Sequence, residues 1–442
     1  MEEYEVIVIG GGPGGAVCAR ELARRGRHVL LIERGEPDRY KPCAGGISPR
    51  TALITPMAPE VAERTVSSSL LVSPKGLQLR LELGGSVGWV AYRHRYDGYL
   101  CRLAEDAGAE VRYRCEARSV ETGRTGATVH VRTPGGEGVL GARCIVGAFG
   151  YTRAGRLLGQ LGVSPPPPIV CVCIEAALDE EQVDDRIGGC LESYFDARIV
   201  RDGYAWIFPR RAGVNVGLAT RSPSGGGSLR NKLTDFIANH PVASAKLKGW
   251  EPKFGSAAAS TFGHLIPGAP AGRVSGERFV LVGDASGAAD PLTGEGIYHA
   301  QRSGQIAAEV LSGMLKEDRL SADDLTVYDD AWRERLYVHG TRYSRLVCRA
   351  FANFRHQNDF VEVFLALAER DENLRRTILA VFSGVGSARE TFRKVVTAGN
   401  FAFAVRRLGW KTLPLVWAAA KTWRERDRED ADRERRRAAP RC

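Results

Sequence analysis

Closely spaced glycines near the N-terminus are the first feature of this sequence that points to chemistry. Gly10, Gly12 and Gly15 form a GxGxxG pattern, with Pro13 and Gly14 inside it. Such glycines permit a tight turn, a close approach of backbone to phosphate, and packing of a helix on a strand. The helix that follows points unpaired N–H groups and its positive dipole end at the phosphate. The pattern predicts a dinucleotide site.

The flanking segments supply the elements that this site needs. Residues Tyr4–Ile9 are rich in Val and Ile, as in a parallel strand buried on both faces. A helical pattern follows the glycines, and a second strand, His28–Ile32, ends at Glu33. A glycine motif between a strand and a helix, with an acidic residue after the next strand, is typical of a true dinucleotide fold. Glu33 is expected to accept hydrogen bonds from ribose hydroxyls, and the adjacent Arg34 is a second candidate.

A late stretch, RFVLVGDASGAADPLTGEGI, indicates which dinucleotide is bound. The strand Arg278–Val282 runs into Gly283 and Asp284, and a helix is expected from about 295 to 315. The stretch resembles the flavin-holding motif of the p-hydroxybenzoate hydroxylase-like flavoproteins. The resemblance implies FAD, with Asp284 on its sugar-alcohol chain. It also implies that the isoalloxazine lies along the Pro-x-x-Gly-x-Gly residues and the start of the helix, namely Pro291, Gly294, Gly296 and Ile297.

A second match to the same family lies around residue 93. Arg93, Tyr96, Asp97 and Leu100 fit its R-x-x-F/Y-D-x-x-L pattern, which implies that the arginine lies near the cofactor phosphates. One position departs from the family. Many relatives show Gly-Ala-Asp-Gly after the fourth strand, where this chain has phenylalanine, Phe149, in place of the aspartate. A flavin or NAD(P)H contact often made from that region is therefore left open.

Three further stretches narrow the choice of flavoprotein. KPCAGGIS contains Cys43 and Ala44, GYAWIFPR contains Tyr204, Trp206 and Phe208, and GEGIYHA closes the flavin motif. Together they resemble the geranylgeranyl reductase family over about residues 1–320. The resemblance implies an FAD-dependent reductase that saturates C=C bonds of a polyprenyl chain on a lipid, quinone or pigment. Ala219 occupies the second glycine position of the family's Gly-x-Gly, which could narrow the site.

Alkene chemistry makes sense of these side chains. An isolated alkene accepts hydride poorly, so protonation must accompany hydride transfer, and a dry apolar channel protects a cation-like transition state. Tyr204, Trp206 and Phe208 alternate and would share one face of a strand. That face lines a channel or simply fills a core. Cys43 is a proton donor, a steric barrier beside the ring, or a small buried apolar residue. His299 is not assigned to catalysis.

Two other functions stay open on the sequence. One is a flavin-dependent monooxygenase or halogenase on the same fold, although halogenases show W-x-W-x-I-P where this chain reads YAWIFP. The other is a flavoprotein that carries electrons to a membrane quinone. No second GxGxxG domain is evident, so the electron donor is NAD(P)H bound transiently or reduced ferredoxin, the latter a possible electron-donor protein partner.

The expected fold is α/β plus α: a Rossmann-type FAD-binding domain, an interleaved antiparallel-sheet substrate domain and a helical C-terminal region. The strand patterns and the stiff Pro165–Pro168 segment suggest the boundaries. The FAD-binding domain takes residues 1–72, 90–164 and 276–320, and the substrate domain takes 73–89 and 165–275. Residues 321–423 form the helical region, and 424–442 are a charged tail expected to be disordered.

Composition limits partners and location. Most of the net charge of +10 lies in residues 391–442, so a nucleic-acid partner is not expected. The ten cysteines lack metal-site spacing, so no metal is expected, and they suit a reducing cytoplasm. Residues 399–423 mix aromatic and basic side chains, which suits a helix on an anionic membrane surface or one packed on protein. We expect a cytoplasmic protein that is peripheral on the membrane and takes a prenylated small molecule or lipid.

Overall fold

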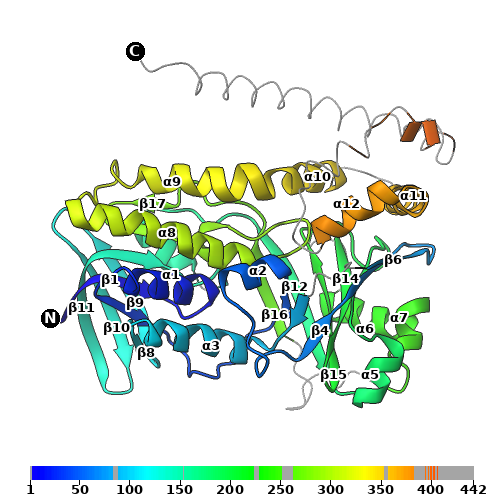
Figure 1. The fold of residues 1–442 in the computed structure, drawn as a ribbon, viewed down its shortest axis with the longest axis horizontal. Helices are drawn as coiled ribbons and strands as arrows, with labels where there is room; N and C mark the ends of the chain where they lie inside the picture. Colours follow the sequence, from blue (N-terminus) through cyan, green and yellow to red (C-terminus); the bar gives the residue numbers. More distant parts are fainter. Residues whose placement is uncertain are drawn as a thin grey trace.

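The architecture consists of two large sheets with helices, shown in Figure 1. It is a computed structural model, and it describes residues 2–82, 88–152, 154–222, 228–250, 262–352 and 357–382 with a few isolated positions up to 406. The predicted tail 424–442 and most of the predicted membrane segment 399–423 lie outside the described residues. In the part of the chain that is described, no helix has the length and apolarity needed to cross a bilayer.

The first sheet forms the dinucleotide-binding domain. Its strand order is β17-β18-β11-β1-β2-β8, with β10 and β9 continuing from β11 as an antiparallel extension. The strands are β1 (Glu2–Ile9), β2 (Val29–Ile32), β8 (Glu110–Arg112), β9 (Glu116–Thr122), β10 (Ala127–Thr133), β11 (Gly136–Gly147), β17 (Ser275–Gly276) and β18 (Phe279–Leu281). The central strands β18, β11, β1, β2 and β8 pair in parallel, as a Rossmann-type sheet requires.

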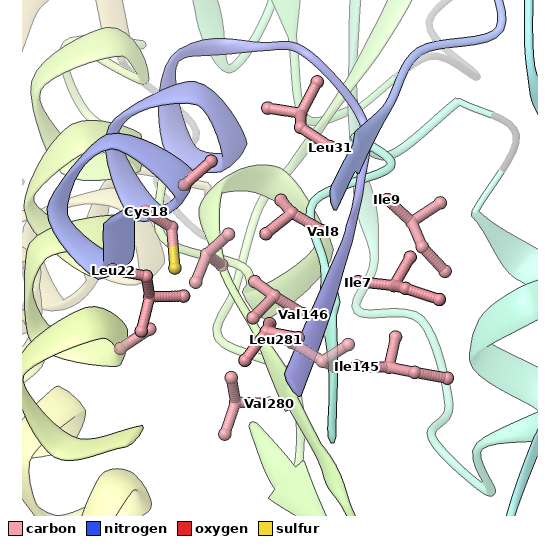
Figure 2. Close-up of a cluster of buried hydrophobic side chains, with 14 of the residues drawn as sticks. Ile7, Val8, Ile9, Cys18, Leu22, Leu31, Ile145, Val146, Val280 and Leu281 are labelled. Carbon is pink, nitrogen blue, oxygen red and sulfur yellow. The ribbon is translucent and has the colours of Figure 1, made fainter. Parts of the chain in front are cut away.

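The apolar core of this domain lies between the parallel strands and the helices on them. Figure 2 shows Val8 of β1, Val146 of β11 and Val280 of β18 on the side of Cys18 and Leu22 of the first helix, whereas Ile7, Ile9 and Ile145 point to the opposite side. The helices of this domain are α1 (Pro13–Ala23), α3 (Arg93–Asp106), α4 (Gly155–Gln160) and α8 (Ile297–Glu317). Strands buried on both faces need continuous apolar sequence, which explains their Val and Ile content.

The second sheet forms the substrate domain and has the order β16-β12-β15-β14-β13-β5-β6. Its strands are β5 (Ser68–Val72), β6 (Gln78–Glu82), β12 (Pro168–Ala176), β13 (Cys190–Tyr194), β14 (Gly203–Arg210), β15 (Gly213–Thr220) and β16 (Phe262–Pro267). All neighbours are antiparallel except β13 and β5. Helices α5 (Glu180–Arg186), α6 (Leu229–Asn239) and α7 (Pro241–Lys246) bury one face of this sheet.

The sheet pairing corrects the expected domain boundary at residue 72. The domain boundary expected from the sequence places strand β5 in the FAD-binding domain, but β5 pairs with β13 and β6 in the substrate sheet. Gly88–Val90 (β7) was placed partly in the substrate domain, yet it pairs with β3 (Gly46–Ile47) and β4 (Arg64–Val66) in a separate three-stranded sheet. The short helix α2 (Pro49–Ile54) follows β3. Strand partners are set by contacts distant in sequence, which a local pattern does not contain.

The helical C-terminal region has regular elements up to residue 382, and most of its expected remainder, 383–423, lies outside the described residues. It comprises α9 (Thr326–Trp332), a π-helical segment η2 (Arg333–Thr341), α10 (Arg342–Ala352), α11 (Gln357–Arg370) and α12 (Glu372–Phe382). Figure 1 shows α9 running along α8, and α11 and α12 beside β6. Apolar residues of α11 and α12 pack on Leu71, Leu79 and Leu81, so these helices cover one end of the substrate sheet.

Candidate active site

A large cavity lies between the dinucleotide-binding domain and the substrate sheet. It gathers most of the residues singled out from the sequence, including Cys43 and all three aromatic residues of β14. The predicted site residues that line it are Gly12, Pro13, Gly14, Cys43, Ala44, Arg93, Tyr204, Trp206, Phe208, Gly283, Asp284, Pro291, Gly294, Gly296 and Ile297. Gly10, Gly15, Glu33 and Arg34 do not line it. Segments far apart in the sequence thus form one site.

The glycines of the first turn have different tasks. A Cβ on Gly10, whose φ is +116°, would overlap the Ala148 carbonyl, and one on Gly15 would overlap the Gly10 carbonyl. These two glycines therefore allow α1 to pack closely on the sheet. A Cβ on Gly12 would meet nothing within 4 Å, although Gly12 lines the cavity. Its missing side chain leaves space for a ligand.

Glu33 is held against the glycine turn. It is 6% exposed, and its Oε2 accepts a hydrogen bond from the Gly11 N–H at 2.9 Å, while Oε1 accepts from the Gly35 N–H. A carboxylate has about four lone-pair directions, so ribose hydroxyls can still be accepted. Arg34 is exposed, and Arg39 is the arginine that contacts Glu33, at 3.2 Å. The structure does not bring Arg34 to this cavity.

Arg93 is buried in an ion-pair cluster. It begins α3, and its Nε and Nη2 donate to the two oxygens of Asp97 at 2.8 and 2.9 Å. Asp97 also pairs with Arg39. Burial alone would raise the pKa of Asp97, but the two arginines lower it below its ordinary value. Because Arg39 also pairs with Glu33, the two guanidinium groups and two carboxylates of this cluster balance in charge. The Arg93 guanidinium lines the cavity and is the cationic group placed to meet a phosphate there.

The Pro291–Gly296 loop, here called the flavin loop, is fastened to the substrate sheet. Tyr204 donates its hydroxyl hydrogen bond to the Thr293 carbonyl at 2.6 Å, and a Cβ on Gly294 would lie 2.9 Å from that hydroxyl. Asp290 Oδ1 accepts from the backbone N–H groups of Leu292 and Thr293. The Tyr204 hydroxyl is therefore engaged in holding the loop, and its ring is the part that faces the cavity.

The opposite side of the flavin loop is fastened by Glu295. Ser48 donates to its Oε1 at 2.6 Å, and Arg50 forms an ion pair with it. Burial would raise the pKa of Glu295, but the Arg50 charge and these hydrogen bonds lower it below its ordinary value. The carboxylate is therefore ionised near neutral pH and is not a proton donor. His299 is buried with Nδ1 2.9 Å from the Glu295 carbonyl oxygen.

Phe149, at the position where relatives have an aspartate, is turned away from the cavity. Ala148 and Gly150 line the cavity, whereas the Phe149 ring packs over Gly147 within the apolar core. A Cβ on Gly147 would lie 2.8 Å from that ring. This chain consequently presents only small residues and backbone to the cavity from that turn.

The three aromatic side chains of β14, here called the aromatic face, line the cavity together. Tyr204 and Trp206 have ring centroids 6.1 Å apart, and Phe208 packs against Gly46. Trp206 donates its indole N–H to Asn215 Oδ1 at 2.7 Å, so its polar atom is satisfied away from the cavity. Ala219 is 8% exposed and lines the same cavity, where a glycine would leave more room. The aromatic face presents apolar surface to a ligand.

Gly217→Ala should disturb this face. A Cβ there would overlap the Trp206 ring and lie 2.7 Å from the Cys173 Cβ, so the indole must move. We expect a loss of about 1–3 kcal/mol in unfolding free energy, the range for an overpacked site. Chemical denaturation measures it. Gly155→Ala is the control, because a Cβ at Gly155 meets nothing within 4 Å; equal stability of the two variants would contradict the packing argument.

Cys43 shares the cavity with two other cysteines, Cys171 and Cys173 of β12. Its Sγ accepts a hydrogen bond from the Gly45 N–H at 3.3 Å, and the Arg93 guanidinium lies within hydrogen-bonding reach of the same sulfur. Burial raises the pKa of Cys171 and of Cys173, so those two thiols stay protonated near neutral pH. The Arg93 guanidinium within hydrogen-bonding reach of its sulfur distinguishes Cys43 from the other two cysteines.

His264 is a cavity residue that the sequence did not single out. It lies on β16 with Nδ1 3.1 Å from Thr152 Oγ1, and its buried Nε2 has no hydrogen-bond partner among the described residues. Burial, with Lys41 and Arg93 nearby, lowers its pKa to about 4, and Asp284 opposes this only in part. The imidazole is therefore neutral near pH 7.

His264→Asn should flatten the acid side of the stability curve. The folded pKa lies below the ordinary 6.5, so the unfolded chain takes up the proton first as the pH falls. The contribution of neutral His264 to the free energy of unfolding is fully present above about pH 6.5 and declines as the pH falls towards about 4. Thermal unfolding across that window measures it. His130→Asn, at a 42% exposed side chain, is the control; wild-type pH dependence in His264→Asn would contradict the expectation.

Other cavity residues were also missed at the sequence level. They are Lys41 and Ser48, the first and last residues of KPCAGGIS, Glu295 in GEGIYHA, and Arg221; the sequence assigns no role to any of them. Adjacency was the available signal, since Lys41 stands two residues before Cys43 and Glu295 lies inside the flavin motif. Arg221 pairs with Asp202 and donates to the Pro291 carbonyl, a contact 70 residues away along the chain.

The residues present fit FAD. Helix α1 begins at the cavity with no side-chain cap, which leaves its first N–H groups for a phosphate, and Gly12 leaves the space. Helix α8 also begins at the cavity with no side-chain cap on Gly296, and its positive end suits the electron-rich side of a flavin ring. Arg93 lines the cavity and would meet the phosphates, and Glu33, held on the glycine turn, would accept from the ribose hydroxyls.

Fold and cavity together define an FAD-dependent oxidoreductase. Residues 3–164 match the family model described as an FAD binding domain. The chain is 31% identical to the digeranylgeranylglycerophospholipid reductase of Methanocaldococcus jannaschii, over 76% of this chain and 84% of that protein. Identity is also 31% to reductase 1 of Methanopyrus kandleri, over 85% and 97%. The chain belongs to the geranylgeranyl reductase family of FAD-dependent oxidoreductases.

Solved structures agree on the fold. A geranylgeranyl bacteriochlorophyll reductase-like protein from Thermoplasma acidophilum has a TM-score of 0.75 at 23% identity, covering 94% of this chain and all of that one. The flavin-dependent brominase Bmp2 has a TM-score of 0.69 at 16% identity, covering 97% and 100%. At these identities the likeness shows a shared fold, and it does not distinguish a reductase from a halogenase.

Proposed function

We propose that this protein is an FAD-dependent reductase that saturates C=C bonds of a geranylgeranyl-type chain carried by a lipid. The observation that carries the proposal is the single cavity that joins the flavin loop, the Cys43 thiol and the aromatic face. Reduced flavin supplies the hydride. The aromatic face and the neighbouring aliphatic residues exclude water and hold the apolar chain, and Cys43 is placed to supply the proton.

The lipid head group is proposed from the relatives. The named relatives in Methanocaldococcus and Methanopyrus are digeranylgeranylglycerophospholipid reductases, so a glycerophospholipid with two prenyl chains is the first substrate to test. The monooxygenase, halogenase and electron-carrier alternatives have no support beyond the shared fold.

Anaerobic incubation tests the function. Dithionite-reduced holoenzyme is mixed separately with digeranylgeranyl glycerophospholipid, geranylgeranyl diphosphate and a prenylated quinone. The masses of the products are then measured by mass spectrometry. We expect gains in steps of two hydrogens, first on the glycerophospholipid. No gain on any prenyl chain would overturn the proposal. Substrate-dependent oxygen consumption in air with a mass gain of oxygen would indicate a monooxygenase, and rapid quinone reduction alone would indicate an electron carrier.

The electron donor proposed is NAD(P)H or reduced ferredoxin. The sequence contains no second GxGxxG motif, so NAD(P)H would bind transiently. Reduced ferredoxin would act as a partner protein. Anaerobic bleaching of the flavin by each donor, followed by stopped-flow absorbance, separates the two. Bleaching by neither donor would exclude both.

We also propose that residues 399–423 dock a cytoplasmic enzyme on the membrane surface. A prenyl-lipid substrate must reach the cavity from a bilayer, and this segment combines Trp410, Trp417 and Trp423 with basic residues. Flotation with anionic liposomes, comparing the full chain with one lacking residues 399–442, tests it. Equal flotation of both proteins would contradict membrane docking through this segment.

A further inference from the structure

An ion pair between the buried Arg210 and the partly exposed Glu175 has no part in the cofactor-binding or catalytic roles of the cavity residues. Arg210, the last residue of β14, is 1% exposed, and its Nη2 lies 3.1 Å from Glu175 Oε1 on β12. The same carboxylate oxygen accepts from Asn215 Nδ2 at 2.8 Å, and Asn215 is fully buried. Burying an ion pair costs desolvation that its attraction often fails to recover, so such a pair is weak evidence for a stabilising role.

The pair leaves polar atoms unsatisfied. Glu175 Oε2 and Arg210 Nε are both buried, and neither has a hydrogen-bond partner among the described residues. A group selected for stability alone would satisfy them, because an unpaired buried polar atom is costly. The hydrogen bonds that Arg210 and Glu175 do make therefore indicate the structural role of the pair.

At one end of this hydrogen-bonded group, Arg210 holds residues Cys43–Gly45, here called the Cys43 loop. Arg210 donates from Nη1 to the Ala44 carbonyl at 2.8 Å and from Nη2 to the Cys43 carbonyl at 3.3 Å. The Tyr92 ring, 4.8 Å from the guanidinium carbon, supports the face of this group. A planar guanidinium can bond two carbonyls and a carboxylate at fixed angles, which an ammonium group cannot.

The other end holds the aromatic face. Asn215 accepts the indole N–H of Trp206 and donates to Glu175. A continuous series of hydrogen bonds thus runs from the Trp206 indole through Asn215, Glu175 and Arg210 to the peptide carbonyls of Cys43 and Ala44. We call these three linking residues the Arg210 bridge. It joins three strands of the substrate sheet, β12, β14 and β15, to a loop that is over 160 residues away from Arg210 in sequence.

The direction of the Cys43 thiol depends on this loop. The Gly45 N–H bonds the sulfur, and Gly45 itself has φ of +74° with its carbonyl accepting from the Ala91 N–H at 2.9 Å. A Cβ on Gly45 would overlap the Ala91 carbonyl. The loop conformation is therefore set by close backbone contacts on one side and by Arg210 on the other.

We propose that Arg210 is a positioning residue that fixes the Cys43 thiol relative to the Trp206 indole, so that both face the same double bond of the substrate. The assignment of a double bond rests on the proposed function, whereas the fixed geometry of the thiol does not. Asn215 and Glu175 transmit the constraint, and Arg210 touches neither substrate nor flavin.

Alkylation of Cys43 tests the geometry in the holoenzyme without any turnover. Wild type, Arg210→Met and Arg210→Lys are treated with iodoacetamide, and labelling of each cysteine peptide is followed by mass spectrometry. Arg210→Met removes the hydrogen bonds that hold the Cys43 loop, and we expect the rate of Cys43 alkylation to change about fivefold or more. Arg210→Lys keeps a charge opposite Glu175 for folding but cannot make the planar contacts, so the Cys43 rate should change there too. Labelling of Cys171, in the same cavity, reports general opening and should stay constant.

Arg278→Met is the matched control. Arg278 is also a buried arginine that donates to backbone carbonyls, those of Arg124 and Arg143, but it does not line the cavity. Both methionine variants should lose thermal stability, and only Arg210→Met should alter Cys43. Wild-type Cys43 labelling in folded Arg210→Met or Arg210→Lys, or an equal change in Arg278→Met, would overturn the proposal.

Turnover separates this inference from the proposed function. With a prenyl lipid that the wild type reduces, Arg210→Lys should lower kcat about 10- to 100-fold with KM within about threefold, as for a small misplacement of a reacting group. A change confined to KM would overturn the positioning role. If the wild type reduces no prenyl chain, the function fails, and the labelling result still decides whether Arg210 positions Cys43.

Discussion

Gly12→Ala is expected to give a folded protein that has lost most of its FAD. The added methyl group would enter the cavity where a Cβ meets no protein atom within 4 Å, at the start of α1. Gly12 has φ of −82°, so alanine adopts its backbone conformation without strain. If crowding by this methyl group costs about 1–3 kcal/mol of FAD binding free energy, the affinity for FAD falls roughly 5- to 150-fold.

The measurement is flavin content after purification and the dissociation constant from titration of the apoprotein. The apoprotein should unfold at the wild-type apoprotein temperature, and the rise in Tm that FAD gives should shrink. Gly313→Ala, at an open position in α8 far from the cavity, should retain wild-type FAD affinity. FAD binding by Gly12→Ala at wild-type strength would mean that the diphosphate does not approach this turn.

Cys43→Ala is expected to abolish most prenyl reduction while FAD stays bound. The variant removes a thiol that accepts from the Gly45 N–H and lies beside Arg93, and a general acid contributes about 10²- to 10⁴-fold to rate. We expect kcat to fall within that range. Cys43→Ser, which keeps a hydroxyl of higher pKa, should recover only a small part of it.

Single-turnover oxidation of the reduced flavin by prenyl lipid, under anaerobic conditions, measures this effect directly. Cys171→Ala serves as the control, because it removes another cavity thiol whose raised pKa and position on β12 give it no acid role in this mechanism. A steric role for Cys43 predicts a different result: Cys43→Ala would keep near-wild-type kcat and accept bulkier chains. Wild-type turnover in both Cys43 variants would remove the proton-donor role.

The dinucleotide site could be predicted from the sequence because its information is local. A strand, a glycine turn, a helix and an acidic residue lie within residues 4–33, and each step has its own chemical signature. The structure has the elements where they were expected, with β1, α1 and β2 in order and Gly10 and Gly15 at close contacts. The alternation of Tyr204, Trp206 and Phe208 also predicted a shared face, since the side-chain period of a strand is two.

Other features could not be predicted because long-range contacts decide them. Strand β5 joined the substrate sheet by pairing with β13, some 120 residues later, and no property of Ser68–Val72 itself names that partner. Phe149 turned into the core once Gly147 left room for its ring, which a missing aspartate did not foretell. Arg34 remained exposed while Arg39 took the contact with Glu33.

The sequence by itself determined the cofactor class and the residue types available for alkene reduction, because turn, strand and helix preferences act over a few neighbouring residues. Only the tertiary structure decided which of these residues meet. It placed Cys43 in the cavity with the aromatic face, engaged the Tyr204 hydroxyl with the flavin loop, and connected Arg210 to the Cys43 loop. Such contacts depend on the packing of one domain on another, where burial favours a hydrogen-bond partner for most polar groups, however distant that partner is in the chain.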